Sequence, residues 1–291
     1  ELILVGDLAR LRRAVGAAGE RVSLRHAGQT LAPGDNLSAV LRRKPDSSMR
    51  QALLCHAAGE ADAVVSAGDT AALMALARAT LAMVPGIDRP AIGKELDGMS
   101  GRFWMLDLGA NVSCTATQLA QFGRMGATLA RHVGGVAEPR VALLNIGTEA
   151  AKGPAVLSEA ARLLERAPGM RYAGFVEGNA LFSGVADVVV SDGFAGNVAL
   201  KSIEGAARMA RHLLDQWLAQ AGDSAIAAAG VETLRHAFDP QRYNGASFVG
   251  LAGVVIKSHG SANVEGFKRA IEEAVLEVEG RIPARLAAEL G

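Results

Sequence analysis

Aromatic residues, cysteines and long apolar runs are all scarce in this sequence. Only 4% of the 291 residues are aromatic, although 50% are hydrophobic and 34 are glycine. Such small side chains suit the close packing of helices on a sheet better than an aromatic-rich β-sandwich. The longest apolar stretch, residues 70–87, is interrupted by Arg78 and Pro85. We therefore expect no membrane-spanning segment.

The two cysteines and the balanced charge exclude further classes of protein. Cys55 and Cys114 are too few for a disulfide framework and form no CxxC pair. A reducing compartment, and hence a cytoplasmic protein, is expected. Because 30 Lys and Arg balance 30 Asp and Glu, no overall field favours nucleic acid as a partner. Any site that binds an anion must therefore be local.

Several motifs of ligand binding are also missing. No GxGxxG follows an expected strand, and GxxxxGK(S/T), HExxH and GxSxG do not occur. These absences argue against dinucleotide-binding, P-loop, zinc-protease and α/β-hydrolase chemistry. We expect neither a metal nor a cofactor.

What the sequence does contain is a regular alternation of short β-branched runs with helical, Ala- and Leu-rich segments. This alternation is typical of βαβ units and predicts a single three-layer α/β/α domain, residues 1–291, with a largely parallel sheet. Strands are expected at 2–5, 22–25, 63–65, 91–94, 104–108, 140–145, 172–176, 188–190 and 254–257. Helices are expected at 8–15, 47–58, 70–83, 117–132, 154–166, 196–220 and 262–279.

Two parts of this pattern have special features. The apolar run after Glu1 has the pattern of a strand already under way, so we expect residues upstream of it. The long amphipathic helix at 196–220 is followed by an Ala- and Gly-rich segment, 220–230, which is predicted to be a hinge. We expect residues 196–240 to form a helical protrusion whose apolar stripe packs in a dimer interface or core, or contacts lipid.

Four expected strands run into small-residue loops that each open a helix. These loops occupy residues 66–70, 145–153, 191–197 and 257–261. In an open α/β sheet, ligands bind at the carboxyl ends of the strands, where helix N-termini offer free N–H groups to an anion. Glycines allow close approach of the backbone, and hydroxyl, amide and lysine groups complete the site. The four loops together predict a phosphate-type ligand.

An ordered series of short strings resembles the bacterial phosphate acyltransferase family of phospholipid synthesis, PlsX. The series is DSSM (46–49), GEADAVVSAG (59–68), PGIDRP (85–90), DLGAN (107–111), LLNIG (143–147), KG (152–153), VEG (176–178), DGF with GN (192–194 and 196–197), and VIK with HGS (255–257 and 259–261). Each string alone is common, but their succession in family order is specific. The resemblance implies a fold similar to isocitrate dehydrogenases and phosphotransacetylases.

The resemblance also implies a function, namely transfer of a long-chain fatty acyl group from acyl carrier protein to inorganic phosphate, giving acyl phosphate. A homodimer is implied, with peripheral contact at the inner membrane face near a downstream membrane acyltransferase. Lys152 and Asn197 match family positions that are important for activity, as the phosphate- and oxyanion-binding groups, and His259 is a candidate proton donor to the departing thiolate. The expected pocket residues are Ser66, Gly68, Thr70, Asn111, Asn145, Gly147, Gly193 and Gly196.

Two departures from the family pattern matter. The family has Asn and Gly where this chain has Asp69 and Ala71. A carboxylate would repel phosphate, so we expect the Asp69 side chain to cap its own helix. The family also begins with an earlier strand that ends in Gly-Gly-Asp, and this segment is expected upstream of Glu1.

Structural roles remain open beside the functional ones. Lys152 can be a solvated surface lysine, Asn197 a helix cap and His259 a turn residue, while Asp107 and Asn111 can serve to turn the chain after a strand. Rival functions also remain open: a phosphotransacetylase-type enzyme that uses short acyl-CoA, and a non-catalytic scaffold that binds acyl carrier protein. A dehydrogenase is disfavoured because the dinucleotide motif is absent.

Overall fold

The three valines of one short strand show how the sheet divides the core. In β8 (Val188–Val190), the outer two valines pack into one apolar cluster, and Val189 packs into a second cluster on the other face. Successive side chains of a strand point to opposite faces, so a strand that is buried on both faces consists entirely of apolar residues. The sheet is therefore the middle of three layers, as expected from the sequence.

The computed structural model describes residues 1–16, 19–32, 34–220, 230–235, 239, 241 and 244–291. The other strands are β1 (Leu2–Gly6), β2 (Val22–His26), β3 (Ala63–Ser66), β4 (Ala91–Gly98), β5 (Gly101–Leu106), β6 (Arg140–Leu144), β7 (Arg171–Val176), β9 (Ala246–Val249) and β10 (Val254–Lys257). The helices are α1 (Leu8–Val15), α2 (Leu37–Arg43), α3 (Ser48–Ala57), α4 (Thr70–Leu81), α5 (Ala116–His132), α6 (Ala155–Leu164), α7 (Gly193–Gln220), α9 (Val264–Glu279) and α10 (Ile282–Leu290), with a 3-10 turn at Gly178–Ala180.

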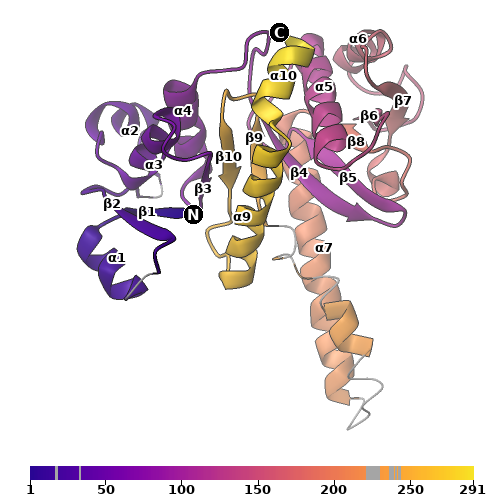
Figure 1. Cartoon of the computed structure of the whole chain (residues 1–291). Coiled ribbons are helices and arrows are strands. Elements are labelled where there is room, and N and C mark those ends of the chain that lie inside the picture. Colours follow the sequence, from indigo (N-terminus) through magenta and orange to yellow (C-terminus); the bar gives the residue numbers. More distant parts are fainter. Residues whose placement is uncertain (17–18, 33, 221–229, 236–238, 240, 242–243) are drawn as a thin grey trace.

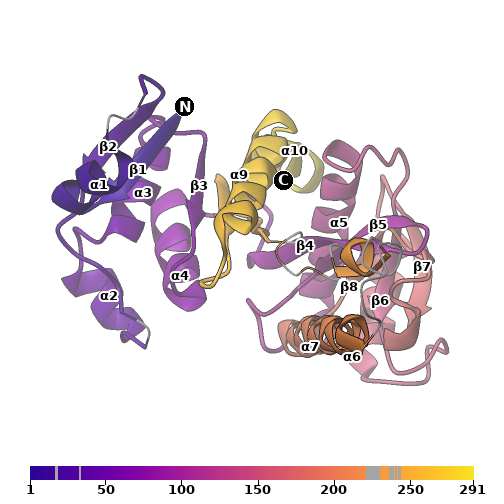
Figure 2. The same cartoon turned by 90° about the horizontal axis from the view of Figure 1, so that it is seen from below.

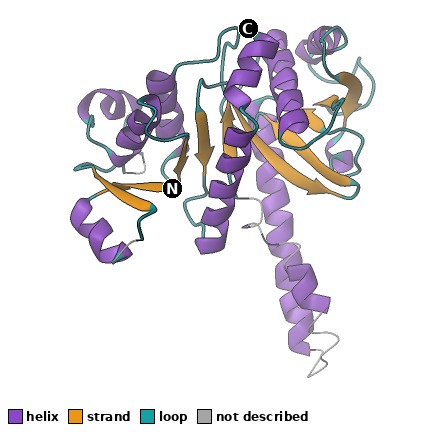
Figure 3. Cartoon of the chain, in the orientation of Figure 1, coloured by secondary structure: helices purple, strands orange, loops and turns teal. Residues whose placement is uncertain are grey.

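Helices cover both faces of an eight-stranded sheet, and a two-stranded sheet of β1 and β2 lies beside it (Figures 1 and 3). On one face, α5, α6 and α10 bury side chains of β5, β6 and β8, and α9 packs on β3 and β10. On the other face, α3, α4 and α7 cover the same sheet. Seen from below, α4 and α7 stand on either side of the central strands (Figure 2).

Three antiparallel pairings in the middle of the sheet reverse its direction. The strand order is β3-β10-β9-β4-β5-β8-β6-β7. The outer pairs, β3–β10 and β5–β8–β6–β7, are parallel, whereas β10–β9, β9–β4 and β4–β5 are antiparallel. The carboxyl ends of β3 and β10 therefore lie at one edge of the sheet, and those of β5, β6 and β8 lie at the opposite edge.

This reversal corrects the expectation that all four small-residue loops share one edge. The loops at 66–70 and 257–261 follow β3 and β10, while those at 145–153 and 191–197 follow β6 and β8. The carboxyl-end rule holds within each half of the sheet, but the two halves point in opposite directions. A ligand that touches loops of both halves must lie across the face of the sheet between them.

Most predicted elements are confirmed within a few residues, and the misses have local causes. The strand β9 was not predicted because its four residues carry no alternating apolar pattern; it forms a hairpin with β10, but its other partner, β4, is remote in the sequence. The helices α2 and α10 were also missed. The strand expected at 104–108 ends at Leu106, since Asp107 begins a turn. The long helix begins at Gly193 rather than at residue 196.

The helix α7 extends away from the body of the molecule (Figure 1). Its outer part exposes Met209, Leu213 and Trp217, each more than half accessible. Arg235, in the helical residues 230–235, forms an ion pair with Asp215 of α7, with 2.5 Å between Arg235 Nη2 and Asp215 Oδ1. Most of the predicted hinge and the 236–238 segment lie outside the described residues. Within the described part of the chain, no helix has the length and apolarity that crossing a membrane requires.

A buried carboxyl group lies between α9 and the sheet. The Glu277 side chain is 2% accessible, and among the described residues its Oε1 atom has no hydrogen-bond partner. Burial, together with the charge of nearby Glu273, raises the pKa of Glu277 to about 8, and a hydrogen bond with Ser247 opposes this shift. Burial, together with the charge of Glu95, likewise raises the pKa of Glu273 to about 7. Glu277 is therefore held as a neutral acid at neutral pH.

Replacing Glu277 with glutamine is expected to flatten the pH dependence of stability. A raised native pKa contributes stability that is complete below the unfolded value near 4.5 and is lost as pH rises through 8. Urea unfolding should therefore show the wild type losing roughly 4 kcal/mol more than Glu277→Gln between pH 5 and 8.5. Exposed Glu279→Gln is the control. Equal losses in the wild type and Glu277→Gln would contradict this assignment.

Candidate active site

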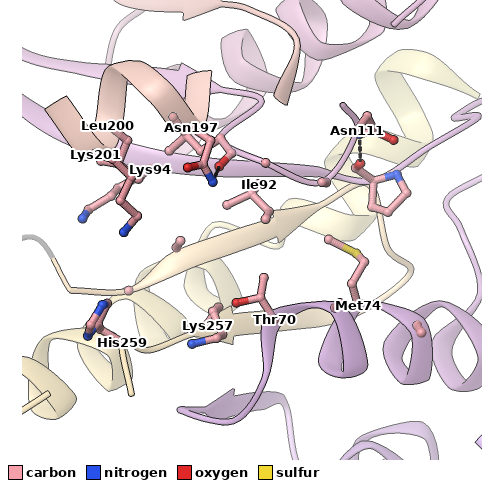
Figure 4. Close-up of a pocket in the computed structure, with 18 of the residues that line it drawn as sticks. Thr70, Met74, Ile92, Lys94, Asn111, Asn197, Leu200, Lys201, Lys257 and His259 are labelled. Carbon is pink, nitrogen blue, oxygen red and sulfur yellow. Dashed lines mark hydrogen bonds between the residues drawn. The ribbon is translucent and has the colours of Figure 1, made fainter. Parts of the chain in front are cut away.

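A cavity of about 540 Å³ lies between α4 and α7, above β4, β9 and β10 (Figure 4). It crosses the face of the sheet at the place where the strand direction reverses. Thr70 enters from α4, Asn111 from the turn after β5, Asn197 from α7 and His259 from the loop after β10. Loops from both halves of the sheet thus meet at one cavity, although they leave the sheet at opposite edges.

The turn after β5 is held by one buried carboxylate. Asp107 is fully buried, and its Oδ1 accepts hydrogen bonds from the backbone N–H groups of Ile92, Gly109 and Ala110 at 2.9, 3.1 and 3.0 Å. Its Oδ2 accepts from the N–H and the side-chain amide of Asn111 at 2.7 and 2.9 Å. Five donors on one carboxylate fix the path of residues 107–111. The turn-forming role that was left open for Asp107 is thus what the structure shows.

The start of α7 packs against this turn through its glycines. A Cβ on Gly196 would lie 1.9 Å from the carbonyl oxygen of Asp107, and one on Gly193 would lie 2.6 Å from that of Asn111. The N–H of Gly193 donates to the Asn111 carbonyl at 2.7 Å, and that of Gly196 donates to the Asp192 carbonyl at 2.9 Å. These two N–H groups are therefore engaged within the fold, and neither glycine lines the cavity.

Side chains from later turns of α7 face the cavity instead. Asn197 donates from Nδ2 to the Leu108 carbonyl at 3.2 Å, which joins α7 to the turn that Asp107 holds. Lys201 lies one turn further along α7 and forms an ion pair with Glu204 at 2.9 Å. Asn197 is inside the helix rather than at its cap, so the capping role left open for it does not apply.

Five cationic side chains line the cavity, namely Arg78, Arg89, Lys94, Lys201 and Lys257. Among the described lining residues, Glu204 is the only carboxylate. Apolar side chains also line the cavity, among them Leu37, Met74, Leu108 and Leu200. The cavity therefore combines a strongly positive region with an apolar region, which suits a ligand that has an anionic part and a hydrocarbon part.

Burial and like charge destabilise the ammonium forms of two of these lysines. Burial lowers the pKa of Lys94 to about 8, with the Glu204 charge opposing this shift and the Lys201 charge adding to it. Burial also lowers the pKa of Lys257, opposed by Asp69 and assisted by Lys201. An anion between these groups would relieve their mutual repulsion.

Asp69 has the capping role that its position predicts. Its Oδ1 accepts a hydrogen bond from the N–H of Ala72 at 2.8 Å and so caps α4. The charge of the same carboxylate opposes the lowering of the Lys257 pKa. Asp69 therefore partly balances the cavity's positive charge. Ser66 and Gly68 precede it, with Ser66 Oγ accepting from the Gly68 N–H at 3.2 Å, and neither lines the cavity.

The His259 ring is oriented by its own loop. The ring Nδ1 of His259 lies 2.8 Å from Ser261 Oγ. The backbone N–H of His259 donates to Asn244 Oδ1 at 2.8 Å. Asn244 also donates from Nδ2 to Ser258 Oγ and to the Gly266 carbonyl, both at 2.7 Å. Buried Asn244 thus anchors the loop that places His259 at the cavity. His259 is therefore part of a turn after β10 and also lines the cavity.

The loop that carries Lys152 lies outside the described lining of this cavity. Asn145 is buried and donates from Nδ2 to the Gly147 and Lys152 carbonyls at 3.1 and 2.8 Å, so it shapes the loop. The Lys152 side chain is 56% exposed and forms an ion pair with Glu149 at 3.0 Å. Of the expected site residues, Thr70, Asn111, Asn197 and His259 share the cavity, whereas this loop does not join them.

Lys94, Lys201 and Lys257 were not predicted as site residues. Only Lys257 lies in a quoted string, and lysines on a strand or in the interior of a helix do not have the pattern of a helix start. Lysine rarity was the available signal, because the chain has only six lysines and three of them line one cavity. Lys94 could not be placed without knowing which face of β4 meets α7.

Comparisons with known proteins show which sequences this chain resembles. A family model described as "Fatty acid synthesis protein" matches residues 1–285. The sequence is 47% identical to phosphate acyltransferase of Alcanivorax borkumensis, over 100% of this chain and 88% of that protein. It is 49% identical to phosphate acyltransferase of Pseudomonas syringae pv. syringae, over 99% and 87%.

Solved structures support the fold. The EutD phosphotransacetylase from Staphylococcus aureus matches with a TM-score of 0.60 at 18% identity, covering 96% of this chain and 86% of that one. A branched-chain phosphotransacylase from Enterococcus faecalis matches with a TM-score of 0.56 at 14% identity, covering 95% and 99%. These likenesses bear out the fold class expected from the sequence.

Replacing Asp107 with asparagine is expected to destabilise the protein by about 3 kcal/mol. The amide would set an N–H₂ group against backbone donors that the carboxylate now accepts, and each lost charged hydrogen bond in the interior is costly. Urea unfolding measures the change, with exposed Asp62→Asn as the control. An Asp107→Asn variant as stable as the control would contradict the role assigned to this carboxylate.

Lys94 is expected to gain reactivity as an amine with a midpoint near pH 8. Competitive acetylation with acetic anhydride, read by peptide mass spectrometry across pH 6–11, measures this midpoint. Glu204→Gln removes a negative charge that favours the ammonium form, so it should lower the midpoint, whereas Lys201→Gln should raise it. Midpoints that stay fixed, or that move the other way, would show that these charges do not face Lys94.

Proposed function

The chain belongs to the phosphate acyltransferase family, and we propose that it moves a long-chain fatty acyl group from acyl carrier protein to inorganic phosphate. The product is acyl phosphate, for use in phospholipid synthesis. The observation that carries this proposal is the cavity between α4 and α7, which joins a cationic region to an apolar wall. Phosphate and an acyl thioester present these two kinds of surface.

The reaction needs hydrogen-bond donors and cations rather than a nucleophilic side chain. A phosphate oxygen attacks the thioester carbonyl, the carbon–oxygen bond forms, and the tetrahedral intermediate collapses with cleavage of the carbon–sulfur bond. The carrier leaves as a thiolate and takes up a proton. Holding phosphate against the carbonyl and stabilising the oxyanion are therefore the main tasks of the protein.

Asn197, His259 and Lys152 are the proposed catalytic residues. Asn197 Nδ2 already donates to the Leu108 carbonyl at the cavity wall, so a ligand oxygen can compete for a donor that is in place. His259 faces the cavity with Nδ1 engaged by Ser261, which orients the ring for proton donation to the thiolate. Lys152 must leave Glu149 to reach a substrate, and an exposed ion pair of this kind costs only about 0–1 kcal/mol to break.

The acyl chain is proposed to lie along the apolar wall formed by Leu37, Met74, Leu108 and Leu200. The rival assignment is a short acyl-CoA substrate, because the two structural neighbours are a phosphotransacetylase and a branched-chain phosphotransacylase. Those neighbours are less than 20% identical to this chain and speak for the fold only. The apolar lining residues favour a substrate with a hydrocarbon chain.

The exposed outer face of α7 is proposed to form the homodimer contact, and the rival proposal is that this face contacts the inner membrane surface peripherally. Met209, Leu213 and Trp217 recur at helical spacing on this face and are each more than half exposed. Apolar faces of this kind mark contacts with a protein or lipid partner. Delivery of acyl phosphate to a membrane acyltransferase would follow directly from such a position.

Alanine at Lys152 or Asn197 is expected to reduce phosphate-dependent turnover of long-chain acyl carrier protein by about 100-fold or more, because each removes a donor to developing negative charge. Acyl phosphate trapped with hydroxylamine measures the turnover. Exposed Lys268→Ala and Asn179→Ala are matched controls. Full activity in either site variant would remove that residue from the mechanism, and faster turnover of acetyl-CoA than of long-chain substrates would favour the short-chain alternative.

A further inference from the structure

The register of three strands sets two lysines on either side of a small residue. Lys257 of β10 lies opposite Ala246 of β9, and Gly93 of β4 lies opposite Ser247 of the same strand. Lys94 is the next residue after Gly93 and so falls beside Ala246. Directly opposed residues in antiparallel strands face the same side, so Lys94 and Lys257 share the cavity face, about 10 Å apart across two strand spacings.

A third lysine completes the group from above the sheet. The charge of Lys201 on α7 contributes to lowering the pKa of both Lys94 and Lys257, so its ammonium group lies near both. Figure 4 shows the Lys94 and Lys201 side chains next to each other at one end of the cavity. Gly245 and Ala246 both line the cavity, and the register places the short Ala246 side chain between Lys94 and Lys257.

The three lysines are not equally occupied by protein partners. Lys201 is paired with Glu204, and Lys257 donates to the Ser258 carbonyl. Among the described residues, the Lys94 amino group has no hydrogen-bond or ion-pair partner, although it faces the cavity. A partly buried ammonium group without a partner is costly unless an anion binds there.

This group lies far from the loop that carries Lys152. The strand order places β5 and β8 between β4 and β6, so three strand spacings, about 14 Å, separate Lys94 from the strand that leads to Asn145. One inorganic phosphate cannot contact both places. On acyl carrier protein, however, the acyl group is attached to a long phosphopantetheine arm. The thioester is at one end of this arm and the phosphate is at the other, so many bonds separate them. Two separate anion sites suit such a substrate together with free phosphate.

We infer that Lys94, Lys201 and Lys257 bind the phosphate group of the 4′-phosphopantetheine arm that carries the acyl chain, while inorganic phosphate binds nearer Asn197. The inference rests on the proposed function and assigns the arm of its acyl donor to a subsite. Acyl carrier protein presents this group as a phosphodiester, and coenzyme A presents it as part of a diphosphate. In both donors, the same three amino groups meet the arm at its charged end.

A matched pair of ligands tests the subsite without catalysis. Calorimetric titration with 4′-phosphopantetheine and with pantetheine, which lacks the phosphate, measures what the phosphate alone contributes. The wild type is expected to bind the phosphorylated compound at least ~10-fold more tightly, as a charge-assisted contact would give. Lys94→Met should abolish most of that preference and Lys268→Met should keep it. Equal or undetectable binding of both compounds to the wild type would overturn the inference.

Steady-state kinetics then distinguish the arm from the nucleophile. Lys94→Met is expected to raise the KM for long-chain acyl carrier protein by ~10-fold or more while the KM for inorganic phosphate changes less than ~2-fold. A comparable rise is expected for acyl-CoA, because it carries the same arm, and an unchanged KM for acyl-CoA would contradict binding of the arm at this subsite. A rise confined to the KM for phosphate would overturn it. Failure of the wild type to use phosphate at all would instead refute the proposed function, and the ligand pair would still decide the subsite.

Discussion

The carboxylate of Asp107 is the constraint on which the geometry of the cavity depends. It has no access to solvent and collects five hydrogen bonds, four from backbone N–H groups and one from the Asn111 side chain. One of those donors belongs to β4, so the carboxylate joins the turn to the neighbouring strand as well as shaping it. The start of α7 packs against this turn, and its glycines approach the turn so closely that no Cβ would fit between them. Asn197 and Lys201 then face the cavity because the first turn of their helix is fixed.

The second constraint is the reversal of strand direction in the middle of the sheet. A uniformly parallel sheet would gather every βα loop at one edge, and the ligand would bind there. Here the antiparallel strands β9 and β4 separate two parallel halves, so the polar loops of the halves point away from each other. The cavity spans the face between them, and its floor is built from a strand, β9, that carries small residues. The position of the site therefore follows from the pairing of β4 with β9, two strands that are far apart in the sequence.

Local signals in the sequence predicted most of the elements but could not predict these pairings. The helix starts at Asp69 and Gly193 and the buried valines of β8 follow from capping, glycine and apolar patterns, and the structure contains them with small shifts. The insertion of β9 beside β4 depends on a partner more than 140 residues away and leaves no local pattern. Thr70, Asn111, Asn197 and His259 were found because they lie in loops or near helix starts. Lys94 was missed because only the register decides which face of β4 it occupies.

The central claim is that acyl transfer takes place in the cavity between α4 and α7. A crystal structure of the protein with a non-hydrolysable long-chain acyl phosphate analogue tests it most directly. The account predicts that the hydrocarbon chain lies along Met74 and Leu200 and that an oxygen of the phosphate or acyl group lies within hydrogen-bond distance of Asn197 Nδ2. A ligand bound outside this cavity, or one whose chain turns away from the apolar wall, would contradict the account.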